Sequence, residues 1–158
     1  MPAPGERLRS LWNRLAPLPG GKTVFSWLLG RITPYSGSIG ARVEELSPGF
    51  CRASLRDRRR VRNHLNSVHA IALANFAELT SGLAVLSGLA PGVQGIVTGF
   101  SITYQKKARG RLVAECRVSG LEVAAERAQE AEVTVSDASG DVVARATAQW
   151  RLRPPHPQ

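Results

Sequence analysis

The sequence has few cysteines and few aromatic side chains: two cysteines in 158 residues, and 6% Phe, Trp and Tyr. Cys51 and Cys116 lie far apart and lack the short spacings of zinc or redox motifs. A chain without a disulfide framework is typical of a reducing compartment, so we expect a cytoplasmic protein. The aromatics are not interleaved with the arginines, which argues against the stacking platforms of proteins that bind single-stranded nucleic acid.

Long apolar runs and familiar catalytic motifs are also scarce. The opening Met-Pro-Ala-Pro-Gly-Glu leads into no secretory signal core, and the apolar run at residues 24–30 covers about a third of a membrane span. We therefore expect no integral membrane segment. The sequence contains no glycine-rich phosphate loop, zinc-ligand spacing or serine-hydrolase elbow, so no cofactor or metal is expected.

The chain does have a large positive charge. Lys and Arg number 21 against 12 acidic residues, a formal net charge of +9, while 43% of the residues are apolar. This length and apolar content predict one folded domain with a real core. A basic surface attracts nucleic acid, anionic membranes or phosphorylated small molecules, and charge alone does not choose among these or exclude a merely solvated surface.

The first part of the chain predicts two short helices. Residues 6–16 place Leu8, Leu11, Trp12 and Leu15 at steps of three and four, as in an amphipathic helix. The sequence PLPGG interrupts this pattern, and residues 22–32 predict the second helix. We expect a helical extension, residues 1–37, that packs on the main body. The arginines of the first helix leave a peripheral membrane role as the alternative.

An arginine-rich segment follows two predicted strands. Residues 38–45 and 49–55 read as strands joined at the turn-forming sequence LSPG. The sequence RDRRRVR then places five arginines within seven positions. A flexible polar loop is one interpretation. A phosphate clamp is the other, because guanidinium groups bind phosphate through paired hydrogen bonds.

One long apolar helix is predicted in the middle of the chain. Asn66 or Ser67 can cap its start, and SGLAPG ends it. Apolar side chains surround most of its circumference, so we expect it inside the protein: Ile71, Leu73, Phe76, Leu79, Leu83, Val85, Leu86 and Leu89. Glu78 lies within this run. Burying an ionised carboxylate without a partner costs several kcal/mol, so its presence calls for a function or an ion pair.

The remainder is rich in strand patterns. Residues 95–105, 111–118, 132–136 and 141–152 predict strands, residues 122–130 suit either a helix or a strand, and a loose tail is expected at 154–158. One helix wrapped by one curved antiparallel sheet buries all these faces, which predicts an α+β domain over residues 38–153.

The helix entrance resembles that of the hotdog-fold acyl thioesterases, in particular the phenylacetate-pathway branch of acyl-CoA thioesterases and its uncharacterised bacterial relatives. That branch has an Asn, a His–Gly six residues later and an acid nine residues after the His. Asn63, His69 and Glu78 stand at these intervals, and FSITYQKKARG resembles the strand and loop that follow. The resemblance covers residues 38–152. Ala70 replaces the usual glycine, which keeps the backbone N–H and adds a methyl group.

The resemblance implies hydrolysis of an acyl thioester. The Ala70 N–H would polarise the thioester carbonyl, and Glu78 would activate water or attack directly. Asn63 would orient the water or the carbonyl, while His69 would shape the loop. Thr98 would have at most a minor role, since it falls one residue from the family's strand hydroxyl position. The structural alternatives are a turn residue for Asn63, a core histidine for His69 and a buried ion pair for Glu78.

His69 and Glu78 lie on opposite sides of one helix, because nine residues turn about 900° and rise about 13.5 Å. If they cooperate, a second subunit must supply Glu78, as in the family's two-fold dimer. A homodimer is therefore expected, with assembly into a tetramer left open.

The basic residues suit a phosphorylated acyl carrier. The resemblance implies acyl-CoA or an acidic acyl-carrier protein as substrate, with Arg58, Arg59, Arg60 and Arg62, or Lys106, Lys107 and Arg109, binding coenzyme A phosphates. A non-catalytic acyl-CoA-binding hotdog protein is the alternative. A basic nucleic-acid-binding protein is a further one, although no helix-turn-helix or RNA-binding signature appears and no specific nucleic acid is expected.

Overall fold

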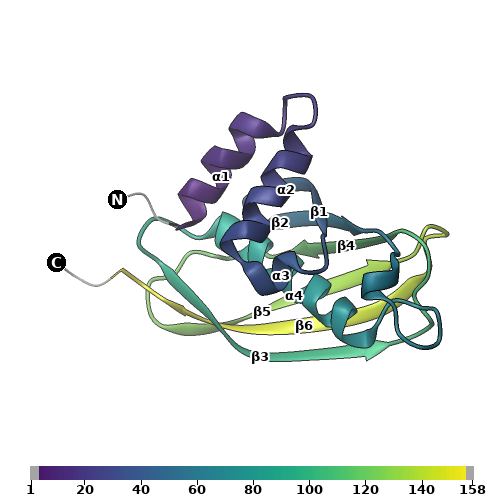
Figure 1. Ribbon diagram of the computed structural model, residues 1–158. Helices are drawn as coiled ribbons and strands as arrows, with labels where there is room; N and C mark the ends of the chain where they lie inside the picture. Colours follow the sequence, from purple (N-terminus) through teal and green to yellow (C-terminus); the bar gives the residue numbers. More distant parts are fainter. Residues whose placement is uncertain (1–3, 156–158) are drawn as a thin grey trace.

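A curved antiparallel sheet wraps one long helix in the computed structural model, which describes residues 4–155 (Figure 1). The α+β layout expected from the sequence is thereby confirmed. In chain order the elements are α1 (Pro4–Leu15), α2 (Gly21–Ile32), α3 (Pro34–Gly37), β1 (Arg42–Ser47), β2 (Phe50–Leu55), a 3-10 turn (Arg59–Val61), α4 (Ala70–Gly88), β3 (Gln94–Tyr104), β4 (Leu112–Arg117), β5 (Arg127–Ser136) and β6 (Val142–Arg153).

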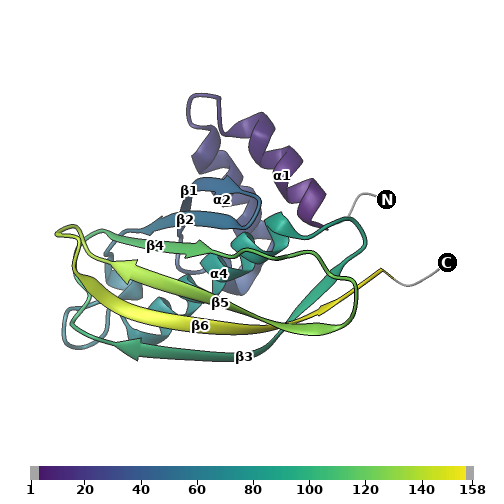
Figure 2. The ribbon, with the colours of Figure 1, turned by 180° about the vertical axis from the view of Figure 1, so that it is seen from behind.

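The six strands are ordered β1-β2-β4-β5-β6-β3, and every neighbouring pair is antiparallel (Figure 2). The chain passes through α4 between β2 and β3, which sends β3 to the far edge of the sheet beside β6. Both edge strands, β1 and β3, therefore have one side without a partner strand among residues 4–155.

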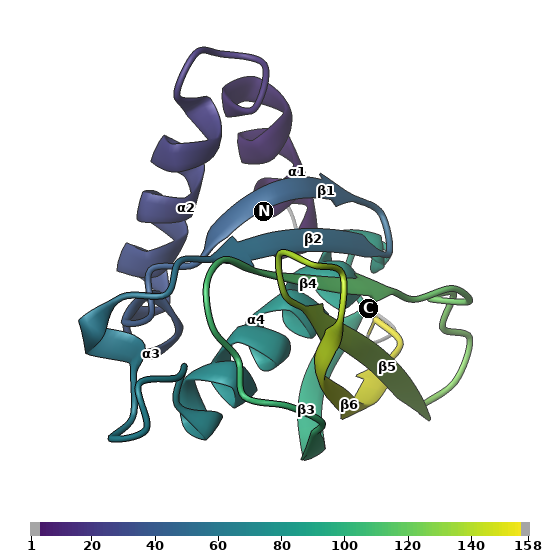
Figure 3. The same ribbon diagram turned by 90° about the vertical axis from the view of Figure 1, so that its right-hand side faces the viewer.

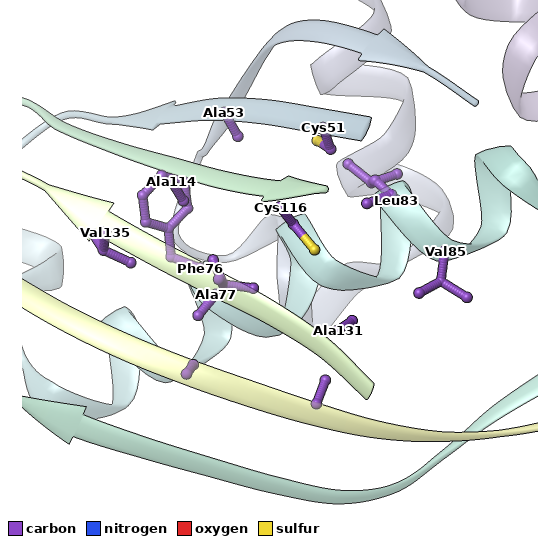
Figure 4. Packing of buried hydrophobic residues seen from close by; sticks show 14 of the residues in the cluster. Cys51, Ala53, Phe76, Ala77, Leu83, Val85, Ala114, Cys116, Ala131 and Val135 are labelled. Carbon is purple, nitrogen blue, oxygen red and sulfur yellow. The ribbon is translucent and has the colours of Figure 1, made fainter. Parts of the chain in front are cut away.

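The core lies between α4 and the concave face of the sheet (Figure 4). Phe76 and Val85 are fully buried on the helix, and small side chains such as Ala114 and Ala131 on the strands give them room. Replacing a buried phenylalanine such as Phe76 with alanine costs about 3–5 kcal/mol in such a core. By length and composition α4 could cross a membrane, but 67% of its most apolar window is buried within the fold, as in the core helix of a soluble protein.

The N-terminal helices pack against α4 and β1 (Figure 3). Trp12 of α1 meets Phe25 of α2 edge to face, with ring centroids 5.0 Å apart. Arg9 donates from Nη1 to the Ser87 carbonyl at 2.6 Å, which ties α1 to the end of α4. Both predicted helices are present and packed on the body, while the division into units at residue 37 stays a prediction.

Local details differ from the sequence-based expectations. Residues 34–37 form α3, so β1 begins at Arg42 rather than at residue 38, since Pro34 starts a helical turn there. The cap of α4 is His69, and not Asn66 or Ser67, because Asn66 adopts a left-handed φ of 56° inside the preceding loop. The ambiguous stretch becomes a strand from Arg127 onward. Most of the predicted tail lies outside the described residues.

Candidate functional site

The loop before α4 is held by Asn63. Its Oδ1 accepts from Leu65 N at 2.9 Å, and from both the N–H and the hydroxyl of Ser67 at 3.2 Å. Arg109 donates to the carbonyls of Leu65 and Asn66, each at 3.4 Å, and so fixes the outer side of the same loop. The Asn63 oxygen thus has the turn-stabilising role that was one alternative from the sequence. A catalytic role for its Nδ2 stays a prediction.

His69 caps the long helix. Its Nδ1 accepts from Ile71 N at 3.0 Å, and its backbone N–H donates to the Val61 carbonyl at 2.7 Å. An accepting Nδ1 carries no proton, so in the neutral ring the proton sits on Nε2. The side chain is exposed. This geometry suits a residue that shapes the helix entrance, and any part in the chemistry stays a prediction.

Ala70 is the first residue of α4, and its backbone N–H has no acceptor among residues 4–155. Its carbonyl accepts from the Tyr104 hydroxyl of β3 at 2.9 Å, which fixes the first turn. The N-terminus of a 19-residue helix carries a partial positive charge. A free N–H at this position can stabilise a developing oxyanion.

A cavity of about 290 Å³ opens beside this helix start. His69, Ala72 and Asn75 line it from the helix side, and Tyr35 from α3 closes the other side. Asn75, which sequence reasoning did not single out, donates from Nδ2 to the Tyr35 carbonyl at 3.2 Å. A polar amide in the second turn of a largely apolar helix was the available signal.

Glu78 is half-buried, and its carboxylate has no hydrogen bond or ion pair within residues 4–155. Burial raises the pKa of Glu78 above its usual range. The buried ion pair considered from the sequence is therefore not present in the described chain. Ile71, Ala74, Glu78 and Gly82 follow one another at steps of three and four, so they form one stripe along α4 that the sheet does not cover fully, with Ile71 56% exposed.

Glu78 and Ala70 do not meet within one chain. They are eight residues apart on α4, about 12 Å along the helix axis, and Glu78 is not among the residues that line the cavity. A single subunit thus holds a donor site at the start of the helix and an unpartnered carboxylate in its middle.

The predicted phosphate-binding residues differ in whether they have an acidic partner. Arg62 pairs with Asp57 at 2.6 Å, which lowers the pKa of Asp57, and Lys106 pairs with Asp137 at 2.6 Å. Both cations already have acidic partners. The other five predicted cations form no ion pair among the described residues: Arg58, Arg59, Arg60, Lys107 and Arg109.

Arg58 and Arg60 line a second cavity of about 540 Å³, and Arg60 also lines the first. Arg59 and Lys107 are exposed and line neither cavity. The predicted basic cluster is therefore brought together only in part.

Thr98 lies on the exposed edge strand β3, where the pairing with β6 shifts between Val97 and Gly99. Its hydroxyl donates to the Gln149 carbonyl at 3.3 Å. It is thus part of an irregular strand pair rather than of the helix entrance, and its minor catalytic role stays a prediction. Within residues 4–155 no cluster of three or more His, Cys, Asp or Glu side chains could hold a metal ion.

Comparison with known proteins places these features in context. The family model described as "Domain of unknown function (DUF4442)" matches residues 21–152, a range that includes α2 as well as the sheet and α4. A structural-genomics crystal structure shares 27% identity at a TM-score of 0.80, covering 94% of this chain and 97% of that one. No curated protein matches the sequence.

Two further crystal structures show the same fold at lower identity. A Pseudomonas aeruginosa protein of unknown function, described as a "Probable Thioesterase", shares 24% identity at a TM-score of 0.74, over 86% of this chain and 96% of that one. A thioesterase from Haemophilus influenzae shares 11% identity at a TM-score of 0.70, over 82% of this chain and 91% of that one. These likenesses confirm the hotdog fold.

Proposed function

This chain belongs to the DUF4442 family, and we propose that it is an acyl thioesterase whose active site forms across a two-fold dimer. One observation carries the proposal: the Glu78 carboxylate is half-buried, has no partner among residues 4–155 and lies on the stripe of α4 that the sheet does not cover fully. The thioesterase names of fold relatives and the spacing of Asn63, His69 and Glu78 support it. That spacing favours the phenylacetate-pathway branch.

The edge strand β3 supports the dimer. Its 11 residues, QGIVTGFSITY, include no charged side chain, none of them is fully buried, and Ile96 is 63% exposed. A long, uncharged edge strand is an aggregation hazard unless another strand covers it. Pairing of β3 with the same strand of a second copy would cover the exposed β3 edge of each subunit. It would also set the two α4 helices side by side.

In this dimer the partner subunit's Glu78 would face the start of α4. The Ala70 N–H donates to the thioester carbonyl oxygen and stabilises the negative charge that develops there. The partner subunit's Glu78 then takes a proton from water, the water oxygen attacks the carbonyl carbon, and the C–S bond breaks to release a thiol and a carboxylic acid. Direct attack by the carboxylate, through a mixed anhydride that water hydrolyses, gives the same products.

The raised pKa of Glu78 suits either role. Carboxylates are weak bases because their pKa normally lies far below neutral pH, and partial burial moves that of Glu78 in the useful direction. The reduced cysteines are compatible with the proposed cytoplasmic location.

Subunit complementation tests this proposal. Ala70→Pro removes the N–H donor and Glu78→Gln removes the base, so each variant alone should be inactive. When the two are mixed, unfolded and reassembled, a heterodimer holds one site with both groups intact if the groups meet across the interface. With random mixing, about half of the dimers are heterodimers and each has one intact site of two, so about a quarter of wild-type activity should return.

If both groups act within one chain, every site in the mixture stays defective and no activity returns, which would contradict the proposal. Acyl-CoA binding by the wild type without any thiol release would instead support the non-catalytic acyl-CoA-binding alternative. Both measurements use the same protein and the same panel of acyl-CoAs, and native mass spectrometry confirms that heterodimers have formed.

A further inference from the structure

The lining of the second cavity, of about 540 Å³, includes six arginines from four parts of the chain. Its lining residues come from α2, α3, β1, β2, α4 and the loops beside them. We call it the arginine pocket; its arginines are Arg31, Arg42, Arg56, Arg58, Arg60 and Arg111. Glu44 is the one acidic residue that the described part of the chain adds to the lining, so these walls carry a net charge of five positive units.

Glu44 neutralises only part of this charge. Its carboxylate accepts from Arg111 at 2.9 Å, lies 3.6 Å from Arg42 and also accepts from the Ser54 hydroxyl at 2.6 Å. Arg31 lies over the Trp27 ring, 5.7 Å from its centroid. The three lining arginines of the loop after β2, Arg56, Arg58 and Arg60, form no ion pair among residues 4–155.

Two of these unpaired guanidinium groups converge on one point. A Cβ at Gly40 would collide with Arg60 Nη2 and lie 3.7 Å from Arg58 Nη1, so both side chains reach over the same backbone. Gly40 also has a φ of +65°, which further restricts this position to glycine. Like charges held this close repel each other, and an anionic ligand would remove that repulsion.

The arginine pocket adjoins the cavity at the start of α4. Arg60 lines both, and Leu79 of the arginine pocket lies one helical turn after Asn75 of the first cavity. A ligand that fills both would reach from the first turn of α4, beside His69 and Ile71, to the arginines.

We propose that the arginine pocket binds the phosphates of the acyl carrier, so that the substrate is a thioester of a multiply phosphorylated small molecule of the coenzyme A type. This inference rests on the proposed function and selects one of its two substrate classes. A 3′-phosphate and a pyrophosphate together bring about four negative charges, close to the charge of the walls.

The size of the pocket argues against a carrier protein. One turn of an α-helix, a cylinder about 10 Å across and about 5.4 Å long, already fills on the order of 400 Å³. An acidic helix therefore does not enter a cavity of about 540 Å³ far enough to meet arginines on opposite walls. The prosthetic arm of such a protein also carries only one phosphodiester charge.

The test compares substrates that differ only in their phosphates. Thiol release is measured with one acyl chain on coenzyme A and on phosphate-free pantetheine, for the wild type and for the double variant Arg56→Gln, Arg58→Gln. We expect KM for the coenzyme A thioester to rise about 10- to 100-fold with kcat little changed, and both constants for the pantetheine thioester to stay the same. Arg14→Gln, an exposed residue of α1 outside both cavities, is the matched control.

A binding experiment separates this inference from the proposed function. Calorimetry with adenosine 3′,5′-bisphosphate and with inorganic pyrophosphate should show binding that the double variant loses, even if no thioester is hydrolysed. Equal KM changes for the two thioesters, or unchanged bisphosphate binding, would overturn the inference. A third result would also overturn the inference. If the wild type binds vesicles of phosphatidylcholine with phosphatidylinositol bisphosphate but not adenosine 3′,5′-bisphosphate, and the double variant does not bind the vesicles, the ligand is a lipid headgroup.

Discussion

Replacing Ala70 with proline deletes one backbone N–H and changes little else. Ala70 is the first residue of α4, where proline is well accepted because the missing N–H has no helical partner. His69 already has φ −62° and ψ 140°, the extended conformation that a residue before proline prefers. The carbonyl of residue 70 remains free to accept from Tyr104.

The two consequences of Ala70→Pro should separate clearly. Removal of one oxyanion donor typically lowers kcat by about 10²- to 10³-fold, or about 2.7–4 kcal/mol in the barrier. The free energy of unfolding should change by less than about 1 kcal/mol, with a small gain expected because proline restricts the unfolded chain. KM should change little, since the donor acts mainly on the transition state.

The measurements are thiol release for kcat and KM, and urea unfolding followed by circular dichroism for stability. Ala70→Gly is the control, because it keeps the N–H and restores the residue usual in the thioesterases that this helix entrance resembles. Its kcat should stay at or above that of the wild type. A folded, dimeric Ala70→Pro variant with wild-type kcat would refute the role of this N–H.

Three further changes test the carboxylate, the interface and the loop. Glu78→Gln should lower kcat by about 10²- to 10⁴-fold, as expected when a general base is lost. Burial raises the pKa of Glu78, so the contribution of this carboxyl to wild-type stability falls as pH rises through that pKa. The stability of the glutamine variant relative to the wild type, measured by urea unfolding, should therefore be greater at pH 7 than at pH 4, and an equal difference at both pH values would contradict this. Ile96→Lys, at a 63% exposed position of β3, should yield monomers in analytical ultracentrifugation and abolish activity, and active monomers would disprove the shared site. Asn63→Ala leaves three donors without their acceptor and should cost about 1–3 kcal/mol of stability, whereas Asn63→Asp, which keeps the oxygen, should cost less.

The sequence predicted the elements whose patterns are local. Alternating side chains marked most strands, and the apolar circumference of residues 70–89 predicted the central helix, because burial on several sides leaves that composition. The helix cap was missed because the choice between Ser67 and His69 depends on Asn66 adopting a left-handed turn. The short helix α3 was missed for a similar reason: its four residues give no periodic signal.

Contacts between distant segments were harder to predict. Arg62 looked equivalent to Arg58 in sequence, yet Asp57 pairs with the first and leaves the second facing the arginine pocket. The arginines of that pocket come from α2, β1, the loop after β2 and the segment before β4, and no spacing in the sequence relates Arg31 to Arg111. Glu78 could be recognised as unusual from its apolar surroundings, but its lack of an ion pair required the fold.

The two cysteines, distant in sequence, stand directly opposite each other where β2 pairs with β4. Both thiols are buried and unbonded, and burial raises the pKa of each, that of Cys116 to about 12. Alkylating reagents attack the thiolate, so modification must await separation of these strands from α4. The rate of alkylation therefore reports how often β2 and β4 separate from α4, with no label introduced.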